Sequence, residues 1–257
     1  IKDTDLSEYA LLDKPYQLGP VYFTTVLGVW VTLYSKKTIP WEQSIVYINE
    51  ETNQITSLKL PTTLDDPLRA VADGRMVLVS RNASQIYIIQ PDMSFKEVDV
   101  KSPIGHLIEA DNHTVIAINK QPLVKNGSIY FEVFLVDVIS GQFTQKSLHL
   151  PNFEMIGAQT TPQAKGKYLI ELVSVSRDLK KFCYLYILGE EQQSPKLGVF
   201  DVEKLEEIKA TSNPQIVSVM TGYAQYHDFL YVSNFGDGYG SKAVLINMIT
   251  LNPLVDF

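Results

Sequence analysis

Six short segments of this chain follow one template, and this internal repeat constrains the fold more than any single residue. Each has an apolar strand end, a polar anchor, a turn, and a large apolar residue five to seven positions after the anchor. A proline follows 12 to 14 positions after the anchor in all copies but the last. The clearest copies are VYINEETNQITSLKLP, YIIQPDMSFKEVDVKSP and FLVDVISGQFTQKSLHLP, and the six anchors are Asp3, Asn49, Gln90, Asp137, Asp201 and Asn247.

The spacing of the anchors predicts the architecture. Successive anchors are separated by 46, 41, 47, 64 and 46 residues. A period of about 40 to 50 residues that holds four short strands is typical of a β-propeller, in which each period forms one blade. The strand-like runs within two of these periods are LRAVA, RMVLVS, QIYIIQ and FKEVDV, then HLIEA, TVIAIN, VFLVDV and FTQKSLHL.

The turns between these runs support strands over helices. Asp73-Gly74 and Asn126-Gly127 are typical of type I′ hairpin turns, in which both central residues need a positive φ. The segment VEKLEEIKA (202–210) also fits a helical pattern, but its place in the repeat predicts a strand.

These features resemble the β-propeller superfamily over nearly all of the chain, by repeat spacing and without a signature motif. No Trp-Asp dipeptide closes a strand, as in WD40 repeats, and no Gly-Gly pair is present, as in kelch repeats. We expect the anchors to act locally, because Asn and Asp side chains accept hydrogen bonds from amides two residues further on.

The repeat predicts one all-β domain, 1–257, of about five four-stranded blades. The units are 16–61, 62–103, 104–151, 152–214 and 215–257, and 1–15 would supply an outer strand that closes the ring. The alternative is a fragment of a larger propeller. Since the chain begins at Ile1 without an initiator Met, we expect a processed or excised product.

The longest interval carries about 18 extra residues around LVSVSRDLKKFCYLYILGEEQQSPK. This segment predicts a hairpin that extends outward with a polar tip at 177–181, followed by a polar loop at 189–196. Such loops are common binding elements on rigid β scaffolds, although a decorative insertion fits the sequence as well.

Composition excludes some partners. The net charge of -7 argues against nucleic acid, which is usually bound by basic surfaces. The most apolar stretch, 20–35, is rich in Val, Thr and Tyr and is too short for a bilayer helix, so no transmembrane segment is expected.

The sequence gives no strong catalytic or metal signal, and no cofactor is predicted. Cys183 lies in an apolar strand and is expected to be an inert core thiol. None of the four histidines has metal-ligand spacing, and His106 and His149 are expected to be ordinary strand residues. The glycine-rich segment NFGDGYGSK (234–242), with Asn234 and Asp237, fits a hairpin tip better than a phosphate loop or a Ca²⁺ site.

Two weaker sets of candidates remain. Propeller enzymes place paired acids on innermost strands, and here the available acids are Glu109, Asp111, Glu154 and Asp228. Among the aromatic residues, Tyr130, Phe131, Tyr184 and Tyr186 are expected to pack between blades, whereas Tyr223, Tyr226 and Tyr239, with Asp237, are candidates for a binding patch.

Three N-glycosylation sequons begin at Asn82, Asn112 and Asn126, all at predicted turns. They favour an extracellular or cell-surface location slightly, while a cytoplasmic one stays open. The sequence thus predicts a non-catalytic propeller that serves as an interaction platform for a protein, small molecule or glycan. The alternatives are a propeller enzyme or small-ligand binder that acts on carbohydrate or a lactone-like substrate, and an intracellular scaffold of WD40-like type.

Overall fold

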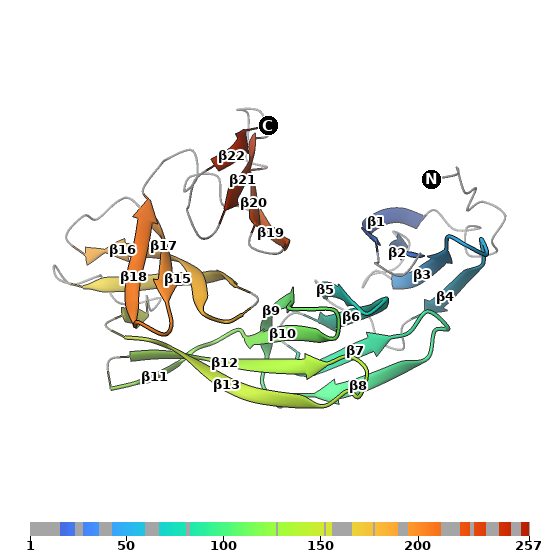
Figure 1. The fold of residues 1–257 in the computed structure, drawn as a ribbon, viewed down its shortest axis with the longest axis horizontal. Helices are drawn as coiled ribbons and strands as arrows, with labels where there is room; N and C mark the ends of the chain where they lie inside the picture. The colour runs from blue at the N-terminus through green and yellow to red at the C-terminus, as the bar shows by residue number, and fades with distance from the viewer. Residues whose placement is uncertain are drawn as a thin grey trace. The chain divides into compact units, whose positions relative to one another are not determined.

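The structure is a computed structural model in which every element of the described residues is a β-strand (Figure 1). The described residues are 16–23, 28–35, 43–59, 67–80, 83–126, 128–151, 153–155, 166–176, 178–189, 195–211, 222–226, 229–234, 242–247 and 253–256. Among them, no helix is long and apolar enough to span a bilayer.

The strand bounds follow the predicted runs closely. They are β1 Tyr16–Phe23, β2 Gly28–Ser35, β3 Gln43–Asn49, β4 Ile55–Lys59, β5 Pro67–Ala72, β6 Arg75–Ser80, β7 Gln85–Ile89, β8 Phe95–Asp99, β9 Ile104–Glu109, β10 Thr114–Asn119, β11 Leu123–Lys125, β12 Ser128–Asp137, β13 Phe143–Leu150, β14 Phe153–Met155, β15 Lys167–Val175, β16 Lys181–Leu188, β17 Lys196–Asp201, β18 Glu206–Thr211, β19 Gly222–Tyr226, β20 Phe229–Asn234, β21 Lys242–Asn247 and β22 Pro253–Asp256. The ambiguous segment 202–210 contains a turn followed by β18, so the prediction of a strand there is confirmed.

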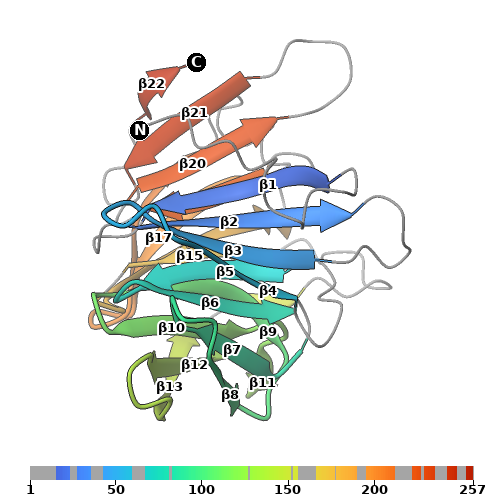
Figure 2. The same cartoon turned by 90° about the vertical axis from the view of Figure 1, so that its right-hand side faces the viewer.

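In the described part of the chain these strands form five sheets, and neighbours in sequence are mostly neighbours in the sheet. The first sheet has the order β1-β2-β3-β4 (Figure 2), the second β5-β6-β7-β8 and the fifth β19-β20-β21-β22. The third has the order β11-β12-β10-β9 with β13 also on β12, and the fourth has the order β14-β15-β16-β17-β18. In the fourth sheet β14 pairs with β15 in parallel, and the other three pairs are antiparallel. The all-β expectation is thus confirmed, whereas the blade count and the closure of the ring stay predictions.

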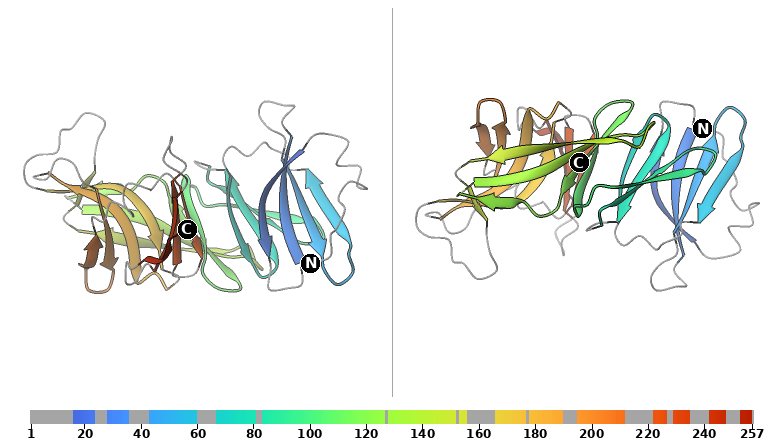
Figure 3. Two further views of the ribbon diagram at one scale, coloured as in Figure 1. Left: turned by 90° about the horizontal axis from the view of Figure 1, so that it is seen from above. Right: turned by 90° about the horizontal axis from the view of Figure 1, so that it is seen from below.

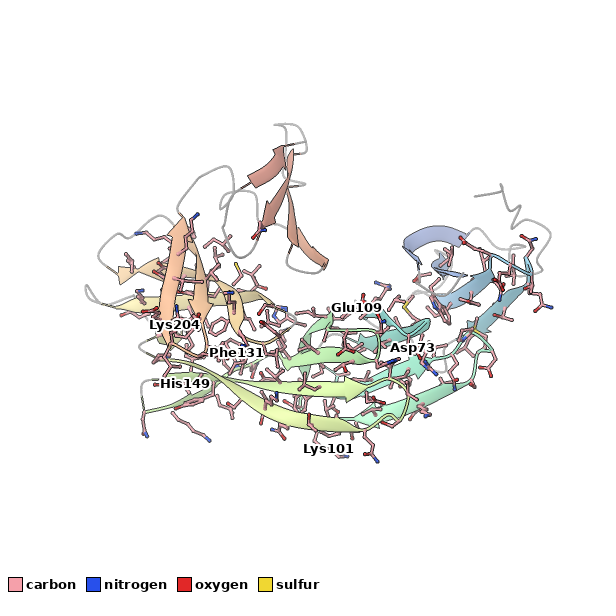
Figure 4. The ribbon with its side chains drawn as sticks, viewed as in Figure 1. Asp73, Lys101, Glu109, Phe131, His149 and Lys204 are labelled. Atoms are coloured by element: carbon pink, nitrogen blue, oxygen red, sulfur yellow. The ribbon has the colours of Figure 1, made fainter. Side chains whose placement is uncertain are left out.

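The chain divides into two compact units, each of which has its own core. Unit 1 comprises 1–104 and 137–142, and unit 2 comprises 105–136 and 143–257. In unit 1 the core joins the first and second sheets through Trp30, Ile45, Tyr47, Met76, Leu78, Tyr87 and Ile89. In unit 2 a core joins the third and fourth sheets, and Phe131, which Figure 4 labels, lies within it beside Tyr184 and Tyr186. The prediction that these residues pack between sheets is therefore confirmed for Phe131, Tyr184 and Tyr186, whereas Tyr130 stacks on His149 within its own sheet.

The anchors Asn49, Asp137 and Asp201 stabilise the turn that follows them. Asn49 Oδ1 accepts hydrogen bonds from the amides of Glu51 and Thr52, each at 3.0 Å. Asp201 Oδ1 does the same for the amides two and three positions on, at 3.0 Å each, and Asp137 Oδ1 does so at 3.1 and 2.6 Å. Three of the anchors are thus structural, as predicted.

Gln90 departs from this pattern because its longer side chain places the oxygen one bond further from the backbone. Asp92 takes over the turn, and its Oδ1 accepts from the amide of Ser94 at 2.9 Å. Asp3 lies outside the described residues.

The turn at Asp73-Gly74 has the predicted backbone, with φ of 48° and 70°. These values fit the type I′ turn between β5 and β6, at the position of Asp73 in Figure 4. Asn126 also has a positive φ of 50°, and Gly127 lies outside the described residues.

The prediction of an outward hairpin in the longest interval is wrong. β15 and β16 are that hairpin, but they lie in the middle of the fourth sheet, with β14 on one side and β17 on the other. Leu172, Val175 and Phe182 are at most 2% exposed. Its tip is also packed, because Leu179 is buried and the amide of Val202 donates to the carbonyl of Lys180 at 2.8 Å, so the hairpin does not project from the sheet. Arg177 at its tip and most of the following polar loop lie outside the described residues.

Candidate functional site

A group of aromatic and charged side chains spans the fourth sheet. This Glu207 cluster consists of Phe153 on β14, Lys167 on β15, Tyr184 and Tyr186 on β16, and Glu207 on β18. Alternation along strands explains why these residues share a face: Phe153 pairs with Lys167, and Tyr184 and Tyr186 are two positions apart. Each strand except β17 supplies a side chain to the cluster.

The strand that contributes no side chain, β17, makes the cluster possible. Gly198 pairs directly with Tyr184, and a Cβ atom there would lie 2.8 Å from Tyr184 Cζ and 3.0 Å from Glu207 Oε2. An irregularity in the pairing of β17 with β18 also places Glu207 opposite Phe200, two residues from Gly198 and on the same face. The missing side chain therefore lets the phenol and the carboxylate meet over the glycine.

Both tyrosines donate hydrogen bonds to the carboxylate of Glu207. Tyr184 Oη donates to Oε2, and Tyr186 Oη donates to Oε1 at 3.2 Å. Burial raises the pKa of Tyr184, and the hydrogen bond with Glu207 raises it further. The Tyr184 phenol consequently stays protonated and acts as a neutral donor across the usual pH range.

Lys167 supplies the positive charge of the cluster. Its Nζ lies 3.4 Å from Glu207 Oε1, 5.5 Å from the centroid of the Phe153 ring and 5.4 Å from that of the Tyr186 ring. Both ring distances are within the range of a cation–π interaction. The side chains of Lys167 and Glu207 are 37% and 22% exposed, so the charged end of the cluster reaches solvent. This arrangement is suited to holding a cation and offers no activated nucleophile.

A second feature is the hairpin tip of the third sheet, which we call the β11 tip: Leu123, Val124, Lys125 and Asn126. Residues 129 and 130 of β12 pair with both β11 and β13, so these two strands lie on opposite edges of β12. β10 and β11 therefore share one edge, as an interrupted strand that lengthens the sheet. Figure 3 shows the strands of this sheet in green to yellow-green.

Asn119 bridges the interruption between β10 and β11. Its side chain is buried, accepts a hydrogen bond from the amide of Glu132 at 2.9 Å and donates to the carbonyl of Gln121 at 2.5 Å. The side-chain oxygen of Asn119 thus accepts a hydrogen bond that a backbone carbonyl of an unbroken strand would otherwise accept. Beyond it, Leu123 and Val124 are 43% and 57% exposed. The sequence did not predict β11, because three exposed residues carry no recognisable period.

The sequence-predicted binding patch is untested by the structure. Tyr223 and Tyr226 lie on β19, where their backbones pair with Val232 and Phe229. Their side chains are outside the described part, as are Tyr239 and Asp237 entirely. Asn234 ends β20.

Of the four candidate acids, Asp111 has a local role. Its Oδ1 accepts hydrogen bonds from the amides of His113 and Thr114, both at 2.8 Å, and stabilises the turn between β9 and β10. Glu109 ends β9, where Figure 4 labels it, and is half-buried. Asp228 and the side chain of Glu154 lie outside the described part. Within that part, no three His, Cys, Asp or Glu side chains gather into a metal site.

The other residues that the sequence singled out are a cysteine, a histidine and the asparagines of the three sequons. Cys183 is 2% exposed, which confirms its place in the core, and burial raises the pKa of its thiol to about 12. His149 lies on β13 and stacks on Tyr130, with ring centroids 4.5 Å apart. Asn112 and Asn126 are exposed at turns, and Asn82 lies outside the described residues.

Sequence reasoning found the two tyrosines of the Glu207 cluster but missed its charged members. Glu207 lies in the segment whose helical and strand patterns compete, and only the irregular pairing with β17 brings it to the tyrosines. The one usable signal was Gly198 within an apolar run, because an isolated glycine in a strand indicates a bulge or a close approach.

No family model and no curated protein sequence matches this chain. Solved structures do resemble it. A structure of a nidogen/laminin complex aligns with a TM-score of 0.51 at 10% identity, over 93% of this chain and 79% of the other. The β-propeller domain of the Trilobed protease from Pyrococcus furiosus aligns with 0.51 at 13%, over 90% and 82%. The Pyrococcus horikoshii acylaminoacyl peptidase aligns with 0.50 at 11%, over 90% of this chain and 44% of the peptidase. At such identities the likeness is one of fold, and the fold of this chain is that of a β-propeller.

Proposed function

We propose that the chain is a non-catalytic β-propeller module that serves as an interaction platform for a protein partner. The observation that carries this proposal is the β11 tip, where two consecutive large apolar residues are about half-exposed on an extension of the third sheet. Isolated exposed apolar residues are ordinary, but these two lie on a strand whose outer edge is covered by no strand of the described residues.

The backbone of β11 favours an extended segment of the partner. β11 pairs with β12 on one edge, and within the described residues no strand covers its other edge. An open edge presents N–H and C=O groups that pair with an added strand, while Leu123 and Val124 contact the partner on alternate faces. Lys125 at the end of β11 limits unspecific pairing, since charges on edge strands oppose aggregation.

The test uses two variants of the secreted or purified chain. Proteins that bind the wild-type chain are captured on it and purified. Their affinity for the wild type and for each double variant is then measured by biolayer interferometry. We expect the double variant Leu123→Lys/Val124→Lys to lose at least about tenfold in affinity, on the order of 1.4 kcal/mol. The control Gln145→Lys/Ser147→Lys, on an exposed part of β13, should bind as the wild type does. Equal loss in both double variants, or none in either, would contradict the proposal.

We also propose an extracellular or cell-surface location. The motivation is that Asn112 and Asn126 are exposed at turns, where an attached glycan meets no packed side chain. When the chain is produced through a secretory pathway, N-glycosidase should lower its apparent mass. The shift should shrink in the variants Asn112→Gln and Asn126→Gln, and an unchanged mass in the wild type would refute glycan attachment.

A further inference from the structure

We propose that the Glu207 cluster is a binding site for an organic ammonium group, with Lys167 as its built-in and replaceable occupant. The site is independent of the β11 tip and goes beyond the interaction proposed for it. The cation it would take is a methylated ammonium, whose charge is spread over apolar methyl groups.

The walls of the site have the geometry of a cation-binding cage. The rings of Phe153 and Tyr186 are 5.7 Å apart and inclined at 82°, and Lys167 Nζ lies 5.5 and 5.4 Å from their centroids. Two nearly perpendicular rings therefore enclose one ammonium group from two sides. Glu207 forms a third, negatively charged wall at 3.4 Å. Aromatic rings with a carboxylate are the usual means by which proteins recognise methylated ammonium groups.

The cage is held in place without the lysine. Phe153, Tyr184 and Tyr186 are at most 2% exposed, and the tilted and edge-on contacts among their rings fix their orientations. The two phenols orient the carboxylate of Glu207 while leaving its negative charge in place. A site that is ordered before binding loses little entropy when a ligand enters.

Lys167, in contrast, is held weakly. Its separation of 3.4 Å from Glu207 exceeds the 2.7–2.9 Å of a strong charge-assisted hydrogen bond, and its side chain is 37% exposed. Ion pairs with this degree of exposure contribute little to stability. A methylated ammonium gains more from the two rings because it is less strongly hydrated than a primary ammonium, so it is expected to compete for the cage.

The test compares choline with its neutral isostere 3,3-dimethyl-1-butanol by NMR titration of the full chain, at constant ionic strength. We expect Lys167→Ala to bind choline at least about tenfold more tightly than the wild type does. The isostere should bind at least about tenfold more weakly than choline, and the double variant Lys167→Ala/Glu207→Gln should lose the gain. Shifted ring resonances of Tyr184 and Tyr186 locate the site.

Several results would overturn the proposal. One is equal choline affinity in the wild type and in Lys167→Ala. Another is a gain that survives Glu207→Gln, or an isostere that binds as well as choline, since the charge would then be irrelevant. If Lys167→Ala fails to fold, Lys167→Gln is used, and failure of both to fold would show that the lysine is structural and not a replaceable occupant.

Discussion

In unit 1, β2 and β3 pack against the second sheet through an apolar core with one directed polar contact, from Trp30 Nε1 to the carbonyl of Gly74 at 2.9 Å. In unit 2, the core between the third and fourth sheets continues into the Glu207 cluster, where two buried phenols meet a carboxylate and an ammonium group that are partly exposed. Both cores join two sheets. In the first, the indole of Trp30 donates to a backbone carbonyl, whereas in the second the charged groups of Lys167 and Glu207 are within reach of solvent.

This difference separates stability from binding. A buried indole that donates to a turn has no group left for a ligand, so changes there should alter stability alone. A carboxylate held between two phenols keeps its charge, and changes there should alter both stability and binding.

Trp30→Ala should destabilise unit 1 by about 3–5 kcal/mol, the usual cost of truncating a buried tryptophan. Trp30 is fully buried at the centre of its core, and its indole hydrogen bond is lost as well. Urea unfolding followed by circular dichroism measures the change. Phe95→Ala, at a site that is 38% exposed, serves as the control with a smaller effect. A cost below about 1 kcal/mol for Trp30→Ala would mean that this core does not join the two sheets as described.

Gly198→Ala should destabilise unit 2 by about 1–3 kcal/mol, the usual cost of overpacking. The added Cβ would lie 2.8 Å from Tyr184 Cζ and 3.0 Å from Glu207 Oε2, so both side chains must move away from residue 198. Cys183, the only cysteine of the chain, is buried on the opposite face of β16 from Tyr184, so iodoacetamide reaches it only when the sheet opens, and its labelling rate reports the lost stability. The wild-type thiol should be nearly inert, because its pKa is raised to about 12. Ser147→Ala, at an exposed position on β13, should leave the rate unchanged, and an unchanged rate in Gly198→Ala would contradict the geometry.

Asp201→Ala should cost about 1 kcal/mol, because two turn amides lose their acceptor. Asp201→Asn should be close to neutral, since Asn49 fills the same role in unit 1 with an amide oxygen. Thermal unfolding of the two variants measures the difference. Equal destabilisation by Ala and Asn would show that the charge matters and not the acceptor, and the two anchors would then not be equivalent.

Asp99 should give the smallest effect, a dependence of stability on pH. The side-chain hydrogen bond from Lys101 and that from its amide lower the pKa of Asp99 to about 2. A carboxyl whose pKa is lower in the folded state stabilises the fold above its unfolded pKa of about 3.9, and this contribution is lost as pH falls toward about 2. NMR titration gives the pKa of Asp99 directly. In the variant Asp99→Asn, the melting temperature should change less between those two pH values than it does in the wild type. A pKa near 4 in the folded chain would refute the interaction.

Much of the fold was predictable because the repeat depends on hydrogen bonds between residues that are close in the sequence. Asn49, Asp137 and Asp201 mark their turns through bonds to residues two and three positions away, and Asp73-Gly74 specifies a turn by itself. These signals need no knowledge of distant residues, so the strands between them follow.

The Glu207 cluster was not predictable in the same way. Its members come from four strands between Phe153 and Glu207, and they meet only because Gly198 and an irregular pairing align them. The outward hairpin was mispredicted for the same reason, since pairing on both edges of β15 and β16 is a property of the sheet and not of the segment. Local chemistry predicts turns, whereas register decides which side chains meet.

The central claim is that Lys167 is a replaceable occupant of the Glu207 cluster. A double-mutant cycle of Lys167→Met and Glu207→Gln, measured in the free energy of unfolding, tests it most directly. We predict a coupling energy of about 1 kcal/mol or less, as for a solvent-exposed ion pair. A coupling of about 3 kcal/mol or more, typical of a buried pair, would make the lysine an integral part of the fold and contradict the claim.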